Sequence, residues 1–161
     1  MQHLHLISDS NIIIDMEVAG LIELIFQLPY IFAVPDILYH EELRKQHSHL
    51  PALGLRCMPM TPDMMIEGIR LASVYKKAGR IDLLALSLSK STGYPLLTGD
   101  MALRKAATEE AVQPRGTLWL IEQLVSHQLI TKQRALDAYQ TMKTNGRRLP
   151  WADAIRRIEK I

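Results

Sequence analysis

Two aspartates follow apolar segments that have the length and composition of buried strands. Asp9 comes directly after LHLIS (residues 4–8), and Asp100 follows PLLT (95–98) through a glycine. In a doubly wound sheet, ligands bind in the crevice beyond the carboxyl ends of the parallel strands. We therefore expect both carboxylates to lie at the same edge of the sheet, where they can act together on a ligand.

Further acidic residues fall where helices should bring them towards this edge. Glu41 and Glu42 lie in the helix predicted after the second strand, and Asp82 lies in the first turn of the helix predicted before the fourth strand. Carboxylates that crowd together raise one another's pKa, so such a cluster calls for a cation. Oxygen ligands select hard divalent ions, here Mg²⁺ or Mn²⁺, and these ions serve phosphoryl chemistry.

Each acid also has a structural explanation when it is considered alone. Asp9 can close a turn with Asn11, and Asp100 can cap the helix predicted over MALRKAA. Asp82 is favourable in a first helical turn because of the helix dipole, and the two adjacent glutamates can be exposed helix residues. The arrival of acids from separate segments at one edge is what favours a shared site.

Apolar segments and helical periodicities alternate along the chain. This alternation predicts an α/β fold of three layers (α/β/α), in which helices cover both faces of a central, mostly parallel sheet. Asp15 is expected to cap a helix over residues 17–28, and Thr61 with Pro62 marks a later helix start. The predicted strands are residues 4–8, 30–34, 54–60 and 95–98, with a short strand end at 113–116. The other predicted helices are residues 36–46, 62–78, 82–91, 101–111, 117–129, 131–143 and 151–161.

The composition is that of one globular domain without a disulfide framework. Of 161 residues, 48% are hydrophobic and 22% are charged, so long disordered segments are not expected. Cys57 is the single cysteine and is expected to fill the core. The N-terminal sequence lacks the features of a signal peptide, and no apolar run reaches the roughly 20 residues of a membrane span. We therefore expect a cytoplasmic protein with no membrane association.

Positive charge is concentrated in the last thirty residues. Residues 1–131 contain 11 basic and 14 acidic residues, whereas residues 132–161 contain 8 and 3. A basic segment suits a polyanion such as a nucleic acid, although a solvated helix face gives the same composition. Trp151 lies among arginines in this segment, where it either stacks on bases or anchors the last helix.

The series of motifs resembles the PIN-domain family of metal-dependent ribonucleases. The D-S-N, I-D-x-x-A-L and L-L-T-G-D motifs occur in the order typical of that family. The resemblance extends over about residues 4 to 125. The stretches that carry it are SDSNIIID (8–15), VPDILYHEEL (34–43), RIDLLALSLSKSTG (80–93), YPLLTGDMALRKAA (94–107) and GTLWLIEQLV (116–125).

The resemblance implies a PIN-like nuclease domain over residues 1–130, with a basic helical extension, residues 131–161, packed on the same domain. It also implies hydrolysis of single-stranded RNA with Mg²⁺ or Mn²⁺ as cofactor. A role as the toxin of a toxin–antitoxin pair would follow, with a homodimeric toxin and a small antitoxin protein as partner. The implied catalytic and metal-binding residues are Asp9, Glu41, Asp82 and Asp100, supported by Asn11 and Thr98, with Glu42 as the alternative acid.

The position of the glutamate depends on how the helix is counted. Counting from Pro35 favours Glu41, whereas counting back from Leu43 favours Glu42. The same segment does not form a zinc motif of the H-E-x-x-H type, because the fourth residue after His40 is Arg44. The sequence also contains no G-x-S-x-G motif and no P-loop.

A second hypothesis needs no catalysis. A catalytically silent PIN-like module could bind RNA or a partner protein through its basic C-terminal segment. Acids near phosphate would weaken such a module, so the clustered carboxylates favour the enzyme. Arg104 and Lys105, which follow Asp100 in the same predicted helix, either hold phosphate or belong to the solvated surface.

Overall fold

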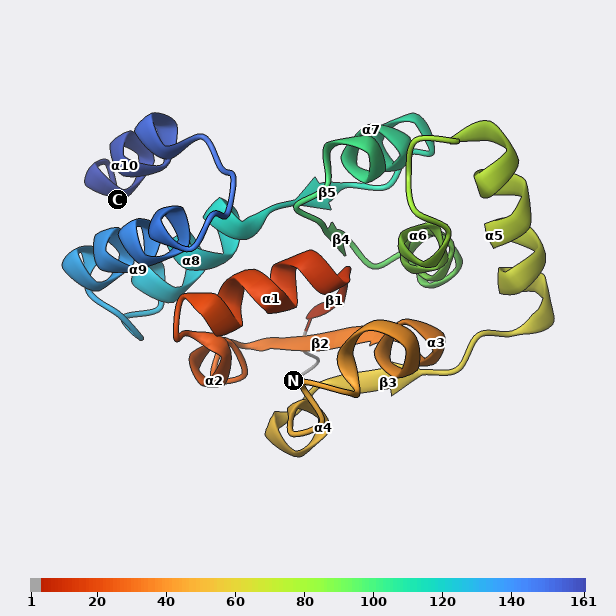
Figure 1. Cartoon of the computed structure of the whole chain (residues 1–161), viewed down its shortest axis with the longest axis horizontal. Helices are drawn as coiled ribbons and strands as arrows, with labels where there is room; N and C mark the ends of the chain where they lie inside the picture. Colours follow the sequence, from red (N-terminus) through yellow and green to blue (C-terminus); the bar gives the residue numbers. More distant parts are fainter. Residues whose placement is uncertain (1–3) are drawn as a thin grey trace.

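A single five-stranded sheet, in which all strands are parallel, forms the centre of the protein (Figure 1). The computed structural model describes residues 4–161. The strand order is β3-β2-β1-β4-β5. The α/β fold predicted from the alternation of elements is confirmed. The strands are β1 (Leu4–Ser8), β2 (Tyr30–Pro35), β3 (Arg56–Met58), β4 (Leu96–Leu97) and β5 (Pro114–Arg115).

The strand order reverses direction beside β1. The chain moves outwards from β1 to β3 and then returns to place β4 on the other side of β1, where Ile7 pairs with Leu96 and Ser8 with Leu97. Such a reversal creates a crevice beyond the carboxyl ends of the two central strands. Asp9 and Asp100 come after these two strands, so the topology places both at the crevice.

Helices cover both faces of the sheet. Crossovers between parallel strands are right-handed, so the helices of the outward and returning halves of the chain lie on opposite faces. Helix α6 packs against β1, β2 and β4, whereas α1 packs with α8 and α9. The helices are α1 (Ser10–Val18), α2 (Ile22–Ile25), α3 (Asp36–Leu38), the π-helical turn η1 (Tyr39–Leu43), α4 (Leu50–Leu53), α5 (Pro62–Val74), α6 (Arg80–Thr92), α7 (Met101–Glu109), α8 (Thr117–Ser126), α9 (Lys132–Thr144) and α10 (Trp151–Glu159).

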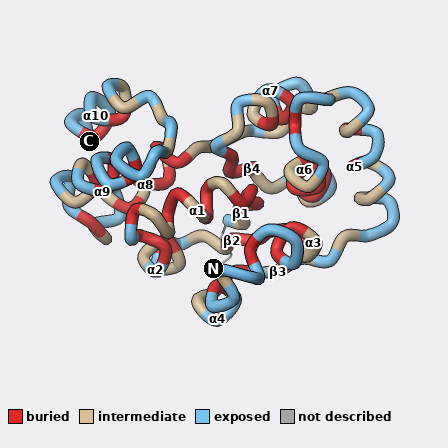
Figure 2. The backbone as a smooth tube through the Cα atoms, in the orientation of Figure 1, coloured by how far each residue is buried: buried red, intermediate tan, exposed pale blue. Residues whose placement is uncertain are grey.

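Buried residues concentrate in the central strands, in α1 and on the inner faces of α6 and α8 (Figure 2). Leu6, Ile7 and Leu97 in the sheet are fully buried, and they pack in one core with residues such as Ile12 of α1 and Leu86 of α6. This packing fixes the ends of β1 and β4 rigidly. The side chains that follow these strands therefore have well-defined positions.

The predicted N-cap at Asp15 is wrong. Helix α1 begins earlier, because the Oδ1 atom of Asp9 accepts a hydrogen bond from the Ile12 amide at 3.0 Å and caps it there. The helix expected over residues 17–28 is divided at Gly20, whose φ of +71° ends α1. Asp15 instead lies buried inside α1, where its carboxylate accepts hydrogen bonds from distant residues.

The C-terminal helices pack on the sheet domain through α1 and α8. Helix α9 contacts both of them, and α10 contacts α9. The segment that joins α9 to α10 is held by Arg147, whose Nε donates to Asp15 Oδ1 at 2.5 Å. Thr117 at the start of α8 donates to the other oxygen of Asp15 at 2.7 Å. This buried carboxylate therefore ties three parts of the chain together.

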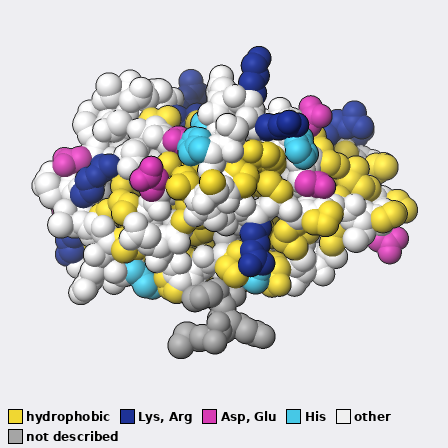
Figure 3. Space-filling model, turned by 90° about the horizontal axis from the view of Figure 1, so that it is seen from below, with side chains coloured by type: hydrophobic (Ala, Val, Ile, Leu, Met, Phe, Trp, Pro, Cys, Tyr) yellow, Lys and Arg dark blue, Asp and Glu magenta, His cyan; other side chains and the backbone are white. Residues whose placement is uncertain are grey.

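Helix α5 presents an apolar outer surface. Ile66 is 64% exposed and Ile69 is 67% exposed. Figure 3 shows apolar side chains gathered towards the end of the molecule where α5 lies. None of the helices in the described chain combines the length and apolar character that a transmembrane span requires.

Candidate active site

Asp9 lies at the carboxyl end of β1 and is fully buried. Its Oδ1 atom caps α1, and its Oδ2 atom accepts hydrogen bonds from the Thr98 hydroxyl at 2.6 Å and the Gly99 amide at 3.3 Å. Burial nevertheless raises the pKa of Asp9 to about 6, against the lowering effect of these hydrogen bonds. The carboxylate is thus held in one orientation but lacks a full counter-charge.

The Thr98–Gly99–Asp100 turn connects β4 to α7 beside Asp9. The Thr98 hydroxyl accepts a hydrogen bond from the Asp100 amide at 3.0 Å while it donates to Asp9. Asp100 caps α7, because its Oδ1 atom accepts from the Ala102 amide at 3.0 Å. Asn11 lies against this turn, since a β-carbon on Gly99 would be 3.7 Å from the Asn11 Cβ atom. The capping explanation and the clustering of acids therefore both apply to Asp100.

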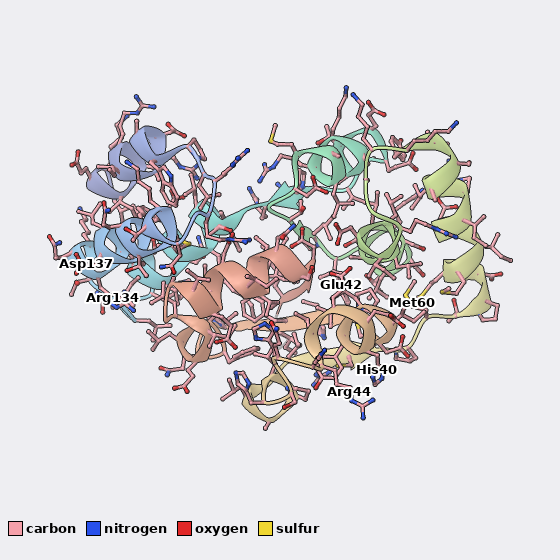
Figure 4. The ribbon with its side chains drawn as sticks, viewed as in Figure 1. His40, Glu42, Arg44, Met60, Arg134 and Asp137 are labelled. Atoms are coloured by element: carbon pink, nitrogen blue, oxygen red, sulfur yellow. The ribbon has the colours of Figure 1, made fainter. Side chains whose placement is uncertain are left out.

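Glu42 is the member of the glutamate pair that lies next to the other acids. Its negative charge raises the pKa of Asp82, and the Ser10 hydroxyl donates a hydrogen bond to its Oε2 atom. Both glutamates are exposed, but Glu41 is not among the charges that act on Asp82. Figure 4 shows Glu42 pointing into the space between α1 and α6, whereas His40 and Arg44 lie on the other side of η1. The structure thus favours the alternative acid over Glu41.

The segment that contains both glutamates forms a π-turn. The Arg44 amide donates to the Tyr39 carbonyl five residues earlier, at 2.7 Å, so η1 contains one more residue than a regular α-helical turn. An extra residue shifts every later side chain around the helix axis. Within this turn, Glu42 is the glutamate that contacts Ser10 and acts on Asp82.

Asp82 lies in the first turn of α6, on the face of the helix that approaches Asp9. Burial, together with the smaller effects of the charges of Asp9, Glu42 and Asp100, raises the pKa of Asp82 to about 7. No hydrogen bond lowers it, in contrast to Asp9. The negative charge of Asp82 is thus less compensated than that of Asp9.

The four carboxylates of Asp9, Glu42, Asp82 and Asp100, which we call the acid cluster, interact electrostatically at one edge of the sheet. Asp100 raises the pKa of Asp9, and the other three members act on Asp82. The ion pairs formed within residues 4–161 include no member of the cluster. An uncompensated group of this kind attracts a cation.

The chemistry of the acid cluster fits Mg²⁺ or Mn²⁺. Its members offer only oxygen ligands, and the raised pKa values of Asp9 and Asp82 mean that the cluster gains from added positive charge. Within residues 4–161, no three acidic, histidine or cysteine side chains are already arranged around one metal position. Mg²⁺ tolerates this arrangement, since it commonly uses one or two carboxylates, several waters and substrate phosphates.

Two residues near the cluster were not predicted to belong to the site. Ser10 donates to Glu42, and its position between two predicted site residues in the D-S-N motif was the available signal. Asp15 lies 3.8 Å from the position of a β-carbon on Gly99, but Arg147 and Thr117 already neutralise and bind its oxygens. Asp15 therefore supports the edge of the site rather than adding free charge to it.

A family model described as PIN domain matches residues 5–160. The chain therefore belongs to the PIN-domain family, as its motifs predicted, and the match includes the C-terminal helices. PIN domains are typically nucleases and are often metal-dependent. The comparison with curated proteins returns no significant match.

Proposed function

We propose that the protein is a Mg²⁺- or Mn²⁺-dependent endoribonuclease that hydrolyses phosphodiester bonds of single-stranded RNA. The observation that supports this most strongly is the acid cluster, whose pKa values are raised to about 6 at Asp9 and about 7 at Asp82. Perturbed carboxylates in a crevice at a topological switch point are typical of functional sites. Membership of a family that consists typically of nucleases supports this reaction class.

The side chains of the cluster have distinct roles in this proposal. Asp9 is a rigid ligand, because the Thr98 hydroxyl and the Gly99 amide fix its Oδ2 atom. Asp82 and Glu42 approach from α6 and η1, and Ser10 holds the glutamate. When bound, the divalent ion supplies Lewis-acid polarisation of the phosphodiester and lowers the pKa of the attacking water.

Protons compete with the metal ion for the carboxylates of the acid cluster. Asp82 with a pKa of about 7 is partly protonated at neutral pH in the absence of metal. A protonated carboxyl group is a poor metal ligand, so the cluster binds a cation most tightly above that pH. The attacking water also loses its proton more readily there. We therefore expect cleavage to increase from pH 6 to pH 8.

A catalytically silent module that binds RNA or a partner protein is the alternative function. The basic residues of the C-terminal segment favour it, because they suit a polyanion without any need for metal. A single experiment separates the two. Single-stranded RNA is incubated with the protein in Mg²⁺, in Mn²⁺ and in EDTA, and both binding and cleavage are measured. Metal-dependent cleavage supports the enzyme, whereas binding without cleavage in all three conditions supports the silent module.

The toxin role remains a proposal that depends on the family. It includes a homodimer and a small antitoxin protein that blocks the site. Expression of the protein in a bacterial host tests it: growth should stop with the wild-type protein and continue with an Asp82→Asn variant. Normal growth with the wild-type protein at the same expression level would instead favour a role in RNA processing.

A further inference from the structure

Two adjoining cavities lie beside Asp100, one of the four members of the acid cluster. One has a volume of about 450 Å³ and is lined by Asn11 and Asp100, together with Gly99, Met101 and Arg148. The other has a volume of about 430 Å³ and lies between α7, the β5–α8 turn and the segment before α10. Because both include Gly99, Met101, Arg148 and Leu149, they form one groove that begins at Asp100.

Three arginines line this groove without a carboxylate partner. Arg104 comes from α7, Arg115 from β5 and Arg148 from the segment before α10. None of the three forms an ion pair within the described part of the chain, whereas the neighbouring Arg147 and Arg157 pair with Asp15 and Glu122 respectively. The groove therefore has uncompensated positive charge directly beside the negative charge of the acid cluster. Arginine binds phosphate well because its planar guanidinium donates to two oxygens at once.

The floor of the groove is apolar and partly aromatic. The Arg115 guanidinium lies 5.5 Å from the centre of the Trp119 ring, and Trp119 in turn packs against Tyr30. Met101, beside Asp100, is 77% exposed although it is apolar. Arginine combined with an aromatic ring and exposed apolar surface suits unpaired bases, which offer a face for stacking.

The wall of the groove that carries Arg148 is anchored. Arg147 donates to the buried Asp15 carboxylate, which also accepts from Thr117, so the chain on one side of Arg148 is fixed to α1 and α8. Arg104 is positioned as well, because its guanidinium lies against Gly116 where a β-carbon would be 2.6 Å away. The arginines thus have defined places before any ligand binds.

We propose that this arginine groove, defined by Arg104, Arg115, Arg148 and Trp119, binds the segment of single-stranded RNA that adjoins the scissile bond. The inference rests on the proposed function and assigns to it the path of the substrate. Phosphates contact the three arginines, and an unpaired base packs against Trp119 and Met101. A duplex is excluded from the floor because its bases are stacked on one another.

Binding to a fluorescent single-stranded RNA of mixed sequence, measured by anisotropy in EDTA between 50 and 200 mM salt, tests the groove without cleavage. We expect Arg148→Ala, Arg104→Ala and Arg115→Ala each to weaken binding about three- to tenfold and to reduce the salt slope by about 0.7, the value for one phosphate contact on a single strand. Arg44→Ala is the matched control, because Arg44 lies on the opposite side of η1 from the cluster (Figure 4). Arg148 is exposed, so its replacement tests the groove without affecting the core.

The outcomes separate this inference from the proposed function. If the wild-type protein cleaves RNA but all three groove variants bind it like Arg44→Ala, the groove assignment is wrong and the nuclease stands. If the groove variants lose RNA binding but the wild-type protein never cleaves, the groove stands and the nuclease fails. Equal affinity for a duplex of the same length, or tighter groove-dependent binding of an acidic peptide, would also overturn the proposal.

Discussion

Neutralisation of Asp82 should stabilise the metal-free protein at alkaline pH. The pKa of Asp82 is raised from 3.8 to about 7 in the folded protein. The native state therefore keeps a proton that the unfolded chain has lost between these pH values. Stability consequently falls as pH rises through this window and is constant above it. An Asp82→Asn variant removes this dependence.

The size of the effect follows from the pKa shift. A shift of about three units corresponds to a ceiling of about 4 kcal/mol, but Asp82 is only partly buried, and solvent screening reduces the expected effect to about 1–2 kcal/mol. The raised pKa of Asp9, about 6, acts in the same direction. Glu67 and Glu110 have pKa values lowered to about 2 by Arg70 and Lys90, so they lose their contribution only at more acidic pH.

Urea unfolding in EDTA at pH 5 and pH 8 measures this effect. We expect Asp82→Asn to be more stable than the wild-type protein at pH 8 and to lose most of that advantage at pH 5. The exposed Glu41→Gln serves as the control for loss of a nearby carboxylate, and it should follow the wild-type protein. If the unfolding free energies of Asp82→Asn and the wild-type protein differ by the same amount at pH 5 and at pH 8, the pKa of Asp82 is not raised in the folded protein.

Three further changes test neighbouring parts of the structure. Arg147→Met leaves the Asp15 carboxylate buried without its cationic partner, so the free energy of unfolding should fall by about 2–3 kcal/mol. A loss below about 0.5 kcal/mol in urea denaturation would contradict this role. Glu42→Gln should lower the rate of RNA cleavage at least tenfold, whereas Glu41→Gln should leave it unchanged, and the reverse order would return the role to Glu41. Thr98→Val removes a hydrogen bond that lowers the pKa of Asp9, so this pKa should rise. The acidic limb of the pH–rate profile should then move to higher pH, and an unchanged limb would contradict this role of Thr98.

The crevice can be predicted from the sequence because its position depends only on where the apolar strands end. Asp9 and Asp100 each follow an apolar strand, and the alternation of strands and helices requires a parallel sheet whose strand ends meet. Asp100 also caps α7, as its position predicts, whereas Asp9 caps α1 through the Ile12 amide instead of closing a turn with Asn11. A carboxylate has two oxygens, and in Asp9 one caps the helix while the other contacts Thr98.

Features that depend on irregular geometry or on distant contacts could not be predicted. The π-turn over Tyr39–Leu43 adds one residue to the helix, and Glu42 rather than Glu41 is the glutamate whose charge acts on Asp82. The pairing of Asp15 with Arg147 joins residues 132 positions apart. No local sequence pattern distinguishes an aspartate that caps a helix from one that forms an ion pair with an arginine near the other end of the chain.

The arginine groove can be recognised only from the tertiary structure. Arg104 was equally compatible with phosphate binding and with a solvated surface, since its neighbours in sequence do not reveal what faces it. The fold brings Arg115 and Arg148 to the same groove from segments far along the chain. Within the C-terminal segment, Arg147, Arg156 and Arg157 form ion pairs, whereas Arg148 does not.

Binding of Mn²⁺ to the purified protein at pH 8, followed by the loss of the free-ion electron paramagnetic resonance signal, tests the central claim most directly. We predict saturable binding by the wild-type protein and by Glu41→Gln, and binding weakened at least tenfold in Asp82→Asn and Glu42→Gln. Circular dichroism confirms that each variant is folded. If the wild-type protein binds no Mn²⁺, or if Asp82→Asn binds it as tightly as the wild-type protein, the acid cluster is not a metal site.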